Sequence, residues 1–451
     1  MTRDEPEWVR HALWWHVYPL GFTGAPVRPA TDDERAPAHR LRHLEPWLDH
    51  LVDLGLNGLL LGPVFASETH GYDTVDHYRL DPRLGDEADV DRLVAACRER
   101  GIRLLFDGVF NHVARIHPAF AEVEAHGRDA ATANLFRIHW DSYEPGGPVP
   151  ADVFEGHEAL VELDHSSPAV VDEVTDVMTY WLERGIDGWR LDAAYAVPPQ
   201  FWQAVLPRVR ERHPDAWFLG EVIHGDYSQL VAGSGMDTVT QYELWQGIWH
   251  GIADRNLFET EHALGRHRGM LETFVPATFV GNHDVTRIAS AVGEDLVPHA
   301  VAILLTVAGT PAVYAGDELG MTGVKEDRLG GDDAVRPAFP AQPPGPGDLA
   351  DHPIWRAHRD LIAVRRRNPW LHEAATDVVD VAHTWLVLRT GTDGAAVVTA
   401  LNIADDGARL PAADATVLLA GSGELDEHAA TVTVPPRGWA VLGAGEAADV
   451  S

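Results

Sequence analysis

In four short segments of the sequence, a run of apolar residues is followed by charged or polar residues. The segments are "LLFDGVFNH" (104–112), "IDGWRLD" (186–192), "FLGEVIH" (218–224) and "FVGNHD" (279–284). In the second segment, the alternation of a strand places Arg190 and Asp192 on one face and Trp189 on the other. Burying charge in such an apolar strand is costly unless the charges are paired and used. The spacing therefore predicts a functional site.

The polar residues of these segments suggest glycoside chemistry. Retaining hydrolysis needs a carboxylate nucleophile and a carboxylic acid about 5–5.5 Å apart. A nearby cation such as Arg190 is expected to hold Asp192 ionised, as a nucleophile must be. A like charge on Asp284 is expected to favour the protonated form of Glu221, which would then act as the acid. One such carboxylate alone would more often be a helix cap or a salt bridge, but four segments of this kind favour one convergent site.

The elements between these segments alternate between strand-like and helix-like patterns. Roughly eight such units over about 360 residues favour an α/β fold, a closed (β/α)8 TIM barrel whose catalytic groups lie at the C-terminal ends of its strands. A doubly wound open sheet is the structural alternative. We expect the barrel to comprise residues 1–112 and 167–370, with an inserted subdomain at 113–166 after the third strand. Residues 371–451 are expected to form a C-terminal antiparallel β-sandwich domain.

The bulk composition excludes several classes of partner. The 451 residues carry a formal net charge of −34, and Lys325 is the only lysine. Such acidity disfavours binding to nucleic acid or to an anionic membrane. No run of about 18 apolar residues occurs, the N-terminus lacks the pattern of a signal peptide, and the single cysteine, Cys97, has no partner in the chain. A cytoplasmic location is expected.

Taken in order, "DGVFNH", "GWRLDAA", "GEVIH" and "FVGNHD" resemble the four short motifs of the α-amylase family, glycoside hydrolase family 13. The resemblance extends from about Ala12 to the C-terminus. It implies that Asp192 is the nucleophile, Glu221 the general acid/base and Asp284 the stabiliser of the transition state. We therefore expect these three residues to be the catalytic residues.

The same resemblance implies a set of substrate-binding residues. Arg190, His112 and His283 would contact the sugar at the cleavage point, Asp107 would organise the site, and Tyr72 in "HGYDTVDHY" would be a stacking platform. Finer features are most similar to the neopullulanase, cyclomaltodextrinase and maltogenic amylase branch. These features are Trp189, His224, which completes the predicted substrate-binding set, and "GGDDAVRP" at Gly330–Pro337. That branch usually carries an N-terminal β domain, whereas here the first barrel strand is expected to begin near Ala12.

Two departures from the family pattern bear on substrate and metal. Where many α-amylases carry a Lys-His pair after the nucleophile, this sequence has Tyr195 and Ala196, which disfavours an enzyme that cleaves starch internally. Asn111 matches a calcium ligand of many α-amylases, but a hydrogen-bonding role at a strand end is equally compatible. The metal site therefore stays unknown: we predict no cofactor and leave calcium open. The histidines show no spacing typical of a transition-metal site.

The 15 tryptophans divide into two groups. Trp14, Trp15, Trp181, Trp202 and Trp217 fall in predicted barrel elements and are expected in the core. Trp140, Trp245 and Trp249 fall in segments that look like loops and are candidates for sugar contacts. The segment from about Met236 to Gly269 gives no clear pattern of helix or strand.

The leading hypothesis is a retaining α-glycoside hydrolase that acts on short or cyclic α-glucans or on small α-glucosides, by double displacement. The first alternative is a transglycosylase or isomerase that makes a disaccharide on the same site. The second is a non-catalytic carbohydrate-binding or interaction relative, which would typically have lost members of the carboxylate trio. The expected partner is an oligosaccharide or small α-glucoside, and the sequence leaves the oligomeric state open.

Overall fold

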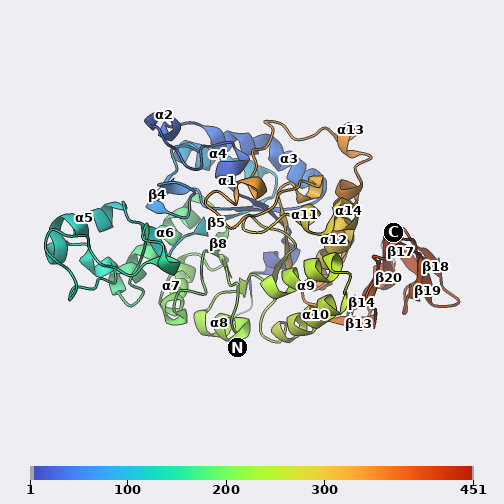
Figure 1. Cartoon of the computed structure of the whole chain (residues 1–451). Coiled ribbons are helices and arrows are strands. Elements are labelled where there is room, and N and C mark those ends of the chain that lie inside the picture. Colours follow the sequence, from blue (N-terminus) through green and yellow to red (C-terminus); the bar gives the residue numbers. More distant parts are fainter. Residues whose placement is uncertain (1–4, 449–451) are drawn as a thin grey trace.

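A closed barrel of parallel strands forms the centre of the molecule, as Figure 1 shows for a computed structural model of the chain. The structure describes residues 5–448, so the first four and last three residues of the predicted barrel and C-terminal domain lie outside the described residues. The strand order is β10-β9-β8-β5-β2-β1-β12-β11, and a parallel bridge between Thr240 and Ala277 closes the ring. The strands are β1 (Trp14–Val17), β2 (Gly58–Leu61), β5 (Arg103–Gly108), β8 (Gly188–Leu191), β9 (Trp217–Gly220), β10 (Thr238–Val239), β11 (Ala277–Phe279) and β12 (Thr310–Tyr314). The predicted (β/α)8 barrel is confirmed.

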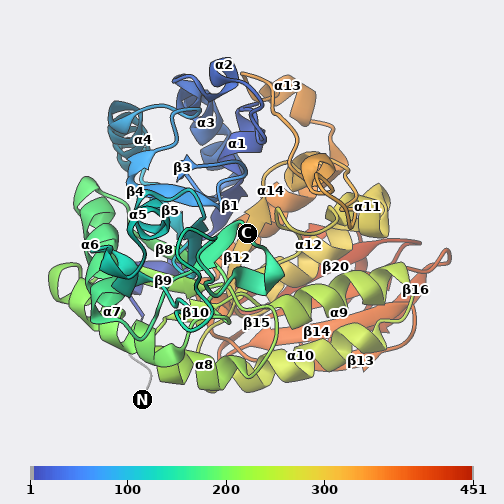
Figure 2. The same ribbon diagram turned by 60° about the vertical axis from the view of Figure 1, so that its left-hand side comes forward.

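Helices surround this barrel, as seen in Figure 2. Helix α6, for example, begins with Pro168 at its first position and ends at Gly185, whose φ of 108° gives the left-handed C-cap that glycine adopts without strain. The main helices are α3 (Glu45–Leu54), α4 (Glu87–Glu99), α6 (Pro168–Arg184), α7 (Pro199–Arg212), α8 (Tyr227–Ser234), α9 (Tyr242–Ala253), α10 (Phe258–Met270), α12 (Val297–Thr306) and α14 (Pro353–Arg367). Shorter helices are α1 (Pro19–Phe22), α2 (Asp32–Arg35), α11 (Ile288–Val292) and α13 (Pro346–Leu349). Within residues 5–448, no helix combines the length and apolar composition needed to cross a bilayer.

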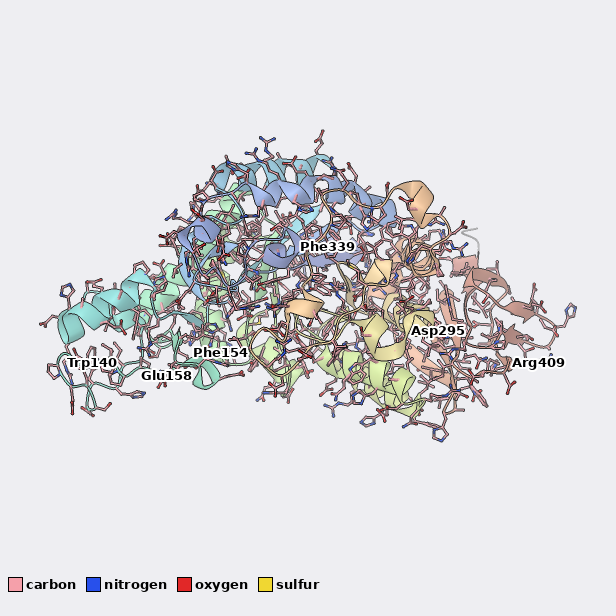
Figure 3. The ribbon with its side chains drawn as sticks, turned by 45° about the horizontal axis from the view of Figure 1, so that its top comes forward. Trp140, Phe154, Glu158, Asp295, Phe339 and Arg409 are labelled. Carbon is pink, nitrogen blue, oxygen red and sulfur yellow. The ribbon has the colours of Figure 1, made fainter. Side chains whose placement is uncertain are left out.

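A long segment leaves the barrel between β5 and α6 and projects to one side, where Figure 3 shows Trp140 farther from the barrel than Glu158 and Phe154. Its frame is an antiparallel pair, β6 (His112–Ala114) with β7 (Leu160–Glu162), and one helix, α5 (Pro118–His126). A second antiparallel pair, β3 (Phe65–Ser67) with β4 (Thr74–Leu80), fills the connection after β2.

The residues after α14 form two antiparallel sheets on the opposite side of the barrel (Figure 1). The larger sheet contains β13 (Thr376–Val381), β14 (Trp385–Gly391), β15 (Ala395–Asn402), β20 (Trp439–Gly445) and β17 (Val417–Gly421); the smaller contains β16 (Ala408–Pro411), β19 (Thr431–Val434) and β18 (Glu424–Asp426). An apolar cluster that includes Val398 and Val432 packs between them. The larger sheet is tied to α12, where buried His299 donates to the backbone oxygens of Asn402 and Gly438 at 3.2 and 2.9 Å. The predicted C-terminal antiparallel β domain is thus confirmed.

Three tryptophans close the end of the barrel at which the strands begin. Trp14 and Trp217 open strands β1 and β9, and their rings stack with centroids 5.6 Å apart. Trp8 packs edge-on against both rings, at 6.1 and 6.3 Å. Large buried aromatic surfaces contribute strongly to stability, so this aromatic plug stabilises the barrel from the end opposite to the predicted site.

The structure resolves the segment that gave no clear pattern. It contains the two-residue strand β10 and most of helices α9 and α10. Trp245 and Trp249 therefore lie on a helix, and the prediction that they fall in loops is wrong. The five tryptophans expected in the core are each at most 1% exposed, which confirms that prediction.

Candidate active site

Neighbouring strands bring the predicted residues to one end of the barrel. Strands β5 and β8 pair in parallel with Asp107 opposite Arg190, and Asp192 follows β8 directly. Glu221 follows the next strand, β9, in the same way. Because the C-terminal ends of parallel barrel strands lie at one face, these four side chains converge.

A single guanidinium holds three carboxylates together. Arg190 Nη1 lies 2.5 Å from Asp107 Oδ2 and 3.2 Å from Asp192 Oδ1, and Nη2 lies 2.7 Å from Glu221 Oε1. All four residues are less than 9% exposed. The buried charge of Arg190 is therefore paired with three acids.

The environment of Asp192 differs from the sequence-based prediction. Burial, and then the negative charge of Glu221, raise the pKa of the Asp192 carboxyl well above its ordinary value, and Arg190 offsets this only in part. Arg190 thus favours the ionised carboxyl, as expected, but burial and the charge of Glu221 outweigh it in the free protein. The reason is that one cation is shared among three buried carboxyl groups, which the spacing of two residues on one strand does not reveal.

Of the two carboxylates Asp192 and Glu221, Glu221 accepts more hydrogen bonds. Besides Arg190, its Oε1 accepts from the Tyr242 hydroxyl at 3.3 Å, and its Oε2 accepts from the Ala193 backbone N–H at 3.1 Å. Ala193 directly follows Asp192 and has a left-handed φ of 46°, which is uncommon for a residue with a side chain. The turn after one acid thus helps to fix the other.

Asp284 lies in a separate cationic pocket. Its Oδ1 accepts from Arg336 Nη2 at 2.7 Å, its Oδ2 lies 3.0 Å from His283 Nε2, and its backbone N–H donates to Asn282 Oδ1 at 2.9 Å. Although burial opposes ionisation, the charges of His283 and Arg336 hold the pKa of Asp284 well below its ordinary value. Asp284 is therefore ionised across the neutral range.

Tyr72 and His112 complete the wall beside these acids. The Tyr72 hydroxyl donates to Asp107 Oδ2 at 3.1 Å and contacts His283 Nε2, and its backbone oxygen accepts from His112 Nε2 at 2.9 Å. The His112 ring stacks on Phe154 of the inserted segment, with centroids 4.6 Å apart. Burial lowers the pKa of His112 to about 4, so the ring is neutral at neutral pH.

These residues surround a cavity of about 560 Å³, here called the catalytic cavity. Asp192, Glu221 and Asp284 line it together with Tyr72 and His112. The buried residues Arg190, Asp107 and His283 support this lining through the contacts given above. His224 does not join the lining: it is exposed, and its ring packs against Tyr195 with centroids 5.3 Å apart.

Several residues at the site were missed by sequence reasoning. Tyr242 and Asn282 form a link in which Asn282 Nδ2 donates to the Tyr242 hydroxyl at 2.8 Å. Arg336 was noted only as part of a motif. Tyr242 could not be found from the sequence because it is the first residue of helix α9, in the segment that gave no clear pattern. Asn282 could have been found, because it lies within the motif "FVGNHD", directly before His283.

Asn111 is the residue that matches a calcium ligand of many α-amylases. Its Nδ2 lies 3.2 Å from His112 Nδ1, which is the hydrogen-bonding role expected at a strand end. Elsewhere in the described part of the chain, two clusters of His, Asp and Glu bring possible ligand atoms within 4.8 Å of one another: His39, Asp86 and Asp89, and His250, Asp254 and Glu259. No step below is derived through a metal.

With this geometry established, comparison with known proteins becomes informative. The sequence profile described as "Alpha amylase, catalytic domain" matches residues 41–376. The chain belongs to the α-amylase family. It is 30% identical over 383 residues to a cyclomaltodextrinase of Geobacillus thermopakistaniensis, covering 80% of this chain and 63% of that protein. It is 31% identical over 345 residues to neopullulanase 2 of Thermoactinomyces vulgaris, covering 71% and 58%.

A solved structure of this family superposes over nearly the whole chain. The debranching enzyme of Nostoc punctiforme, soaked with acarbose, gives a TM-score of 0.79 at 26% identity and covers 98% of this chain and 100% of its own. The chain spans about three fifths of the length of the curated relatives it matches first. Membership of the α-amylase family agrees with the four motifs.

Proposed function

We propose that this member of the α-amylase family is a retaining α-glycoside hydrolase of short or cyclic α-glucans or small α-glucosides. The observation that carries the proposal is the guanidinium of Arg190, which contacts Asp192 and Glu221 together. It supports a short separation of the two carboxyl groups, of the kind that retaining enzymes use, about 5–5.5 Å. A cytoplasmic location remains part of the proposal.

The reaction would proceed in two displacements. Asp192 attacks the anomeric carbon while Glu221 protonates the leaving oxygen, and water then resolves the glycosyl–enzyme with Glu221 as base. Positive charge that develops on the sugar favours the carboxylate form of Asp192, and Glu221 supplies the proton that the leaving oxygen takes up. Ionised Asp284 would accept hydrogen bonds from hydroxyl groups of the distorted ring, and Arg190, Tyr72, His112 and His283 would position that ring.

The preference for small substrates rests on the side of the catalytic cavity beyond Glu221. The Tyr195 hydroxyl donates to Glu155 Oε1 at 2.8 Å, which joins the segment after β8 to the inserted segment. Phe154 and His157, from the same segment as Glu155, also line the catalytic cavity. We infer that this bridge restricts the room available to an internal segment of a long glucan.

A transglycosylase is the second candidate, because the lining beyond Glu221 also contains apolar groups. Ile223 is 37% exposed and lines the cavity with Tyr195 and Phe154. An apolar acceptor region favours a sugar ring over water as the acceptor. Hydrolysis and transfer therefore compete for the same intermediate.

A product time course tests the proposed function. The panel is maltose, maltotriose, isomaltose, trehalose, sucrose, cyclodextrin, pullulan and starch, followed by anion-exchange chromatography. We expect cleavage of short or cyclic substrates, slow action on starch, and α-configured products in the first minutes by NMR. Longer products at high sugar concentration would identify the transglycosylase. Starch as the fastest substrate, or β-configured first products, would contradict the proposal.

Removing the Tyr242 hydroxyl tests the newly recognised link between Glu221 and Asp284. In Tyr242→Phe we expect kcat to fall about 10-fold with KM within twofold, because one hydrogen bond that orients Glu221 is lost. Steady-state kinetics on the best substrate of the panel measures this. Tyr195→Phe is the matched control: it loses a hydroxyl at the same cavity but no contact to Glu221, so KM should change more than kcat. Equal losses of kcat in the two variants would exclude a specific role for Tyr242.

A further inference from the structure

A second cavity of about 500 Å³ adjoins the catalytic cavity and shares part of its wall. The shared residues are Asp284, Val285 and Lys325. We call it the tryptophan chamber. Its lining consists of Trp245, Trp249, Val280, Asp284, Val285, Thr286, Ile288, Ala291, Lys325 and Asp327. The chamber therefore lies directly beside the cavity that contains Asp192 and Glu221.

The walls of the chamber are aromatic and apolar. Trp245 and Trp249 project from successive turns of helix α9, with ring centroids 5.9 Å apart. Trp245 is braced from behind by Phe279, on which it stacks at 6.2 Å. Ile288 and Ala291 come from α11, which lies beside α9 (Figure 1).

The two indoles are only partly buried, unlike the barrel tryptophans, which are fully buried. Apolar surface that lines an open cavity of this size is typical of ligand sites. Trp245 packs edge-on against Tyr242, with ring centroids 5.8 Å apart, whereas the proposed reaction gives Trp249 no role.

The rim of the chamber is polar. Lys325, the only lysine of the chain, lies there with its Nζ 3.4 Å from Asp332 Oδ1, and its backbone N–H donates to Thr286 Oγ1 at 3.1 Å. Asp327 and Asp284 add carboxylate acceptors. Flat apolar walls with donors and acceptors at the edge match a sugar ring, which has an apolar C–H face and a rim of hydroxyl groups; a simple alkyl group would leave the polar rim unused.

We propose that the tryptophan chamber binds a second sugar ring of the substrate while the first ring lies over Asp192 and Glu221. The inference rests on the proposed α-glucoside activity and deepens it: the preferred substrate carries at least one sugar besides the one attacked. Trp249 and Trp245 are then specificity-determining residues.

Binding is measured without turnover, by calorimetry in an Asp192→Asn parent. Maltotriose can occupy both cavities, whereas methyl α-glucoside has only the ring that the catalytic cavity needs. Adding Trp249→Ala should weaken maltotriose binding about 10-fold and leave methyl α-glucoside binding unchanged, because the loss is confined to one aromatic face. Trp249→Leu, which keeps apolar bulk should the alanine variant fold poorly, should weaken binding similarly, and Trp249→Phe should restore most of it.

The matched control is Trp140→Ala, since Trp140 is also partly buried but lies at the far end of the inserted segment (Figure 3). It should leave both affinities unchanged. An unchanged affinity for maltotriose in Trp249→Ala would overturn the proposal that the chamber binds a sugar, and would leave the proposed function standing. If Trp249→Ala weakens the binding of octyl α-glucoside and not that of maltotriose, the chamber binds an apolar aglycone. That result would likewise overturn the proposal of a second sugar site. If neither maltotriose nor methyl α-glucoside binds to the parent, the proposed function fails, and the chamber inference fails with it.

Discussion

Asp192→Asn is expected to lower kcat by about 10⁴-fold or more and, at neutral pH, to make the protein more stable. The activity falls because an amide cannot form the covalent glycosyl intermediate. The stability rises because the folded protein no longer holds this carboxyl in a buried site beside Glu221, where burial and that neighbouring charge raise the pKa of Asp192.

The sign of the stability change depends on pH. A carboxyl whose pKa is raised on folding contributes its full stability below its unfolded pKa, about 3.9, and loses that contribution as pH rises toward the folded pKa. The gain in the Asn variant should therefore be near zero at pH 4 and reach about 1–2 kcal/mol at neutral pH.

Urea unfolding at pH 4 and pH 7, together with product assays, measures both effects. Asp81→Asn is the control, since Asp81 is also buried but is paired with Arg83 at 2.6 Å, so removing its charge should destabilise the protein. Residual turnover above about one hundredth of the parent would refute the role of nucleophile. A loss of stability at pH 7 in the Asp192 variant would refute the electrostatic argument.

Arg190→Met should cost both activity and stability. The guanidinium contacts Asp107, Asp192 and Glu221, all of them buried. Removing one partner of a buried ion pair costs about 3–5 kcal/mol, because uncompensated charge stays behind. We expect a loss of this size in the free energy of unfolding at pH 7, and a fall in kcat/KM of about 10³-fold because the acids lose their common support.

The loss in Arg190→Met should shrink toward pH 4, where protonation of the acids removes the uncompensated charge. Arg190→Lys should not restore activity, because one ammonium lacks the planar fork that reaches separate acids through Nη1 and Nη2. Urea unfolding across this pH range, with kinetics on the same samples, provides the measurement. An unfolding midpoint that does not change at pH 7 would contradict the argument.

The barrel could be predicted because strands such as Gly58–Leu61 and Arg103–Gly108 contain apolar runs, and the barrel strands alternate along the chain with helices whose ends are recognisable. The positions of Asp192 and Glu221 followed from the same pattern, since each comes directly after a barrel strand. The sequence therefore indicated which acids converge before any geometry was available.

Helix α9 could not be predicted as easily, because Gly247 and Gly251 interrupt its pattern. A side-chain carbon at Gly247 would lie 2.4 Å from the Ala263 side chain of α10, so glycine permits the close approach of the two helices. Strand β10, with two residues, is too short to show a pattern. The charge state of Asp192 was also beyond the sequence, because it depends on how many acids surround Arg190.

The aromatic plug at the opposite end of the barrel has a consequence for how this protein can evolve. Trp8, Trp14 and Trp217 anchor the barrel at the end where the strands begin. None of them belongs to the lining of either cavity. Substitutions selected for a new substrate, at positions such as Tyr195 or Trp249, therefore leave the packing of the plug and its contribution to stability unchanged. The chain is in this sense robust at one end and adaptable at the other, which lowers the chance that an adaptive substitution is lost through misfolding.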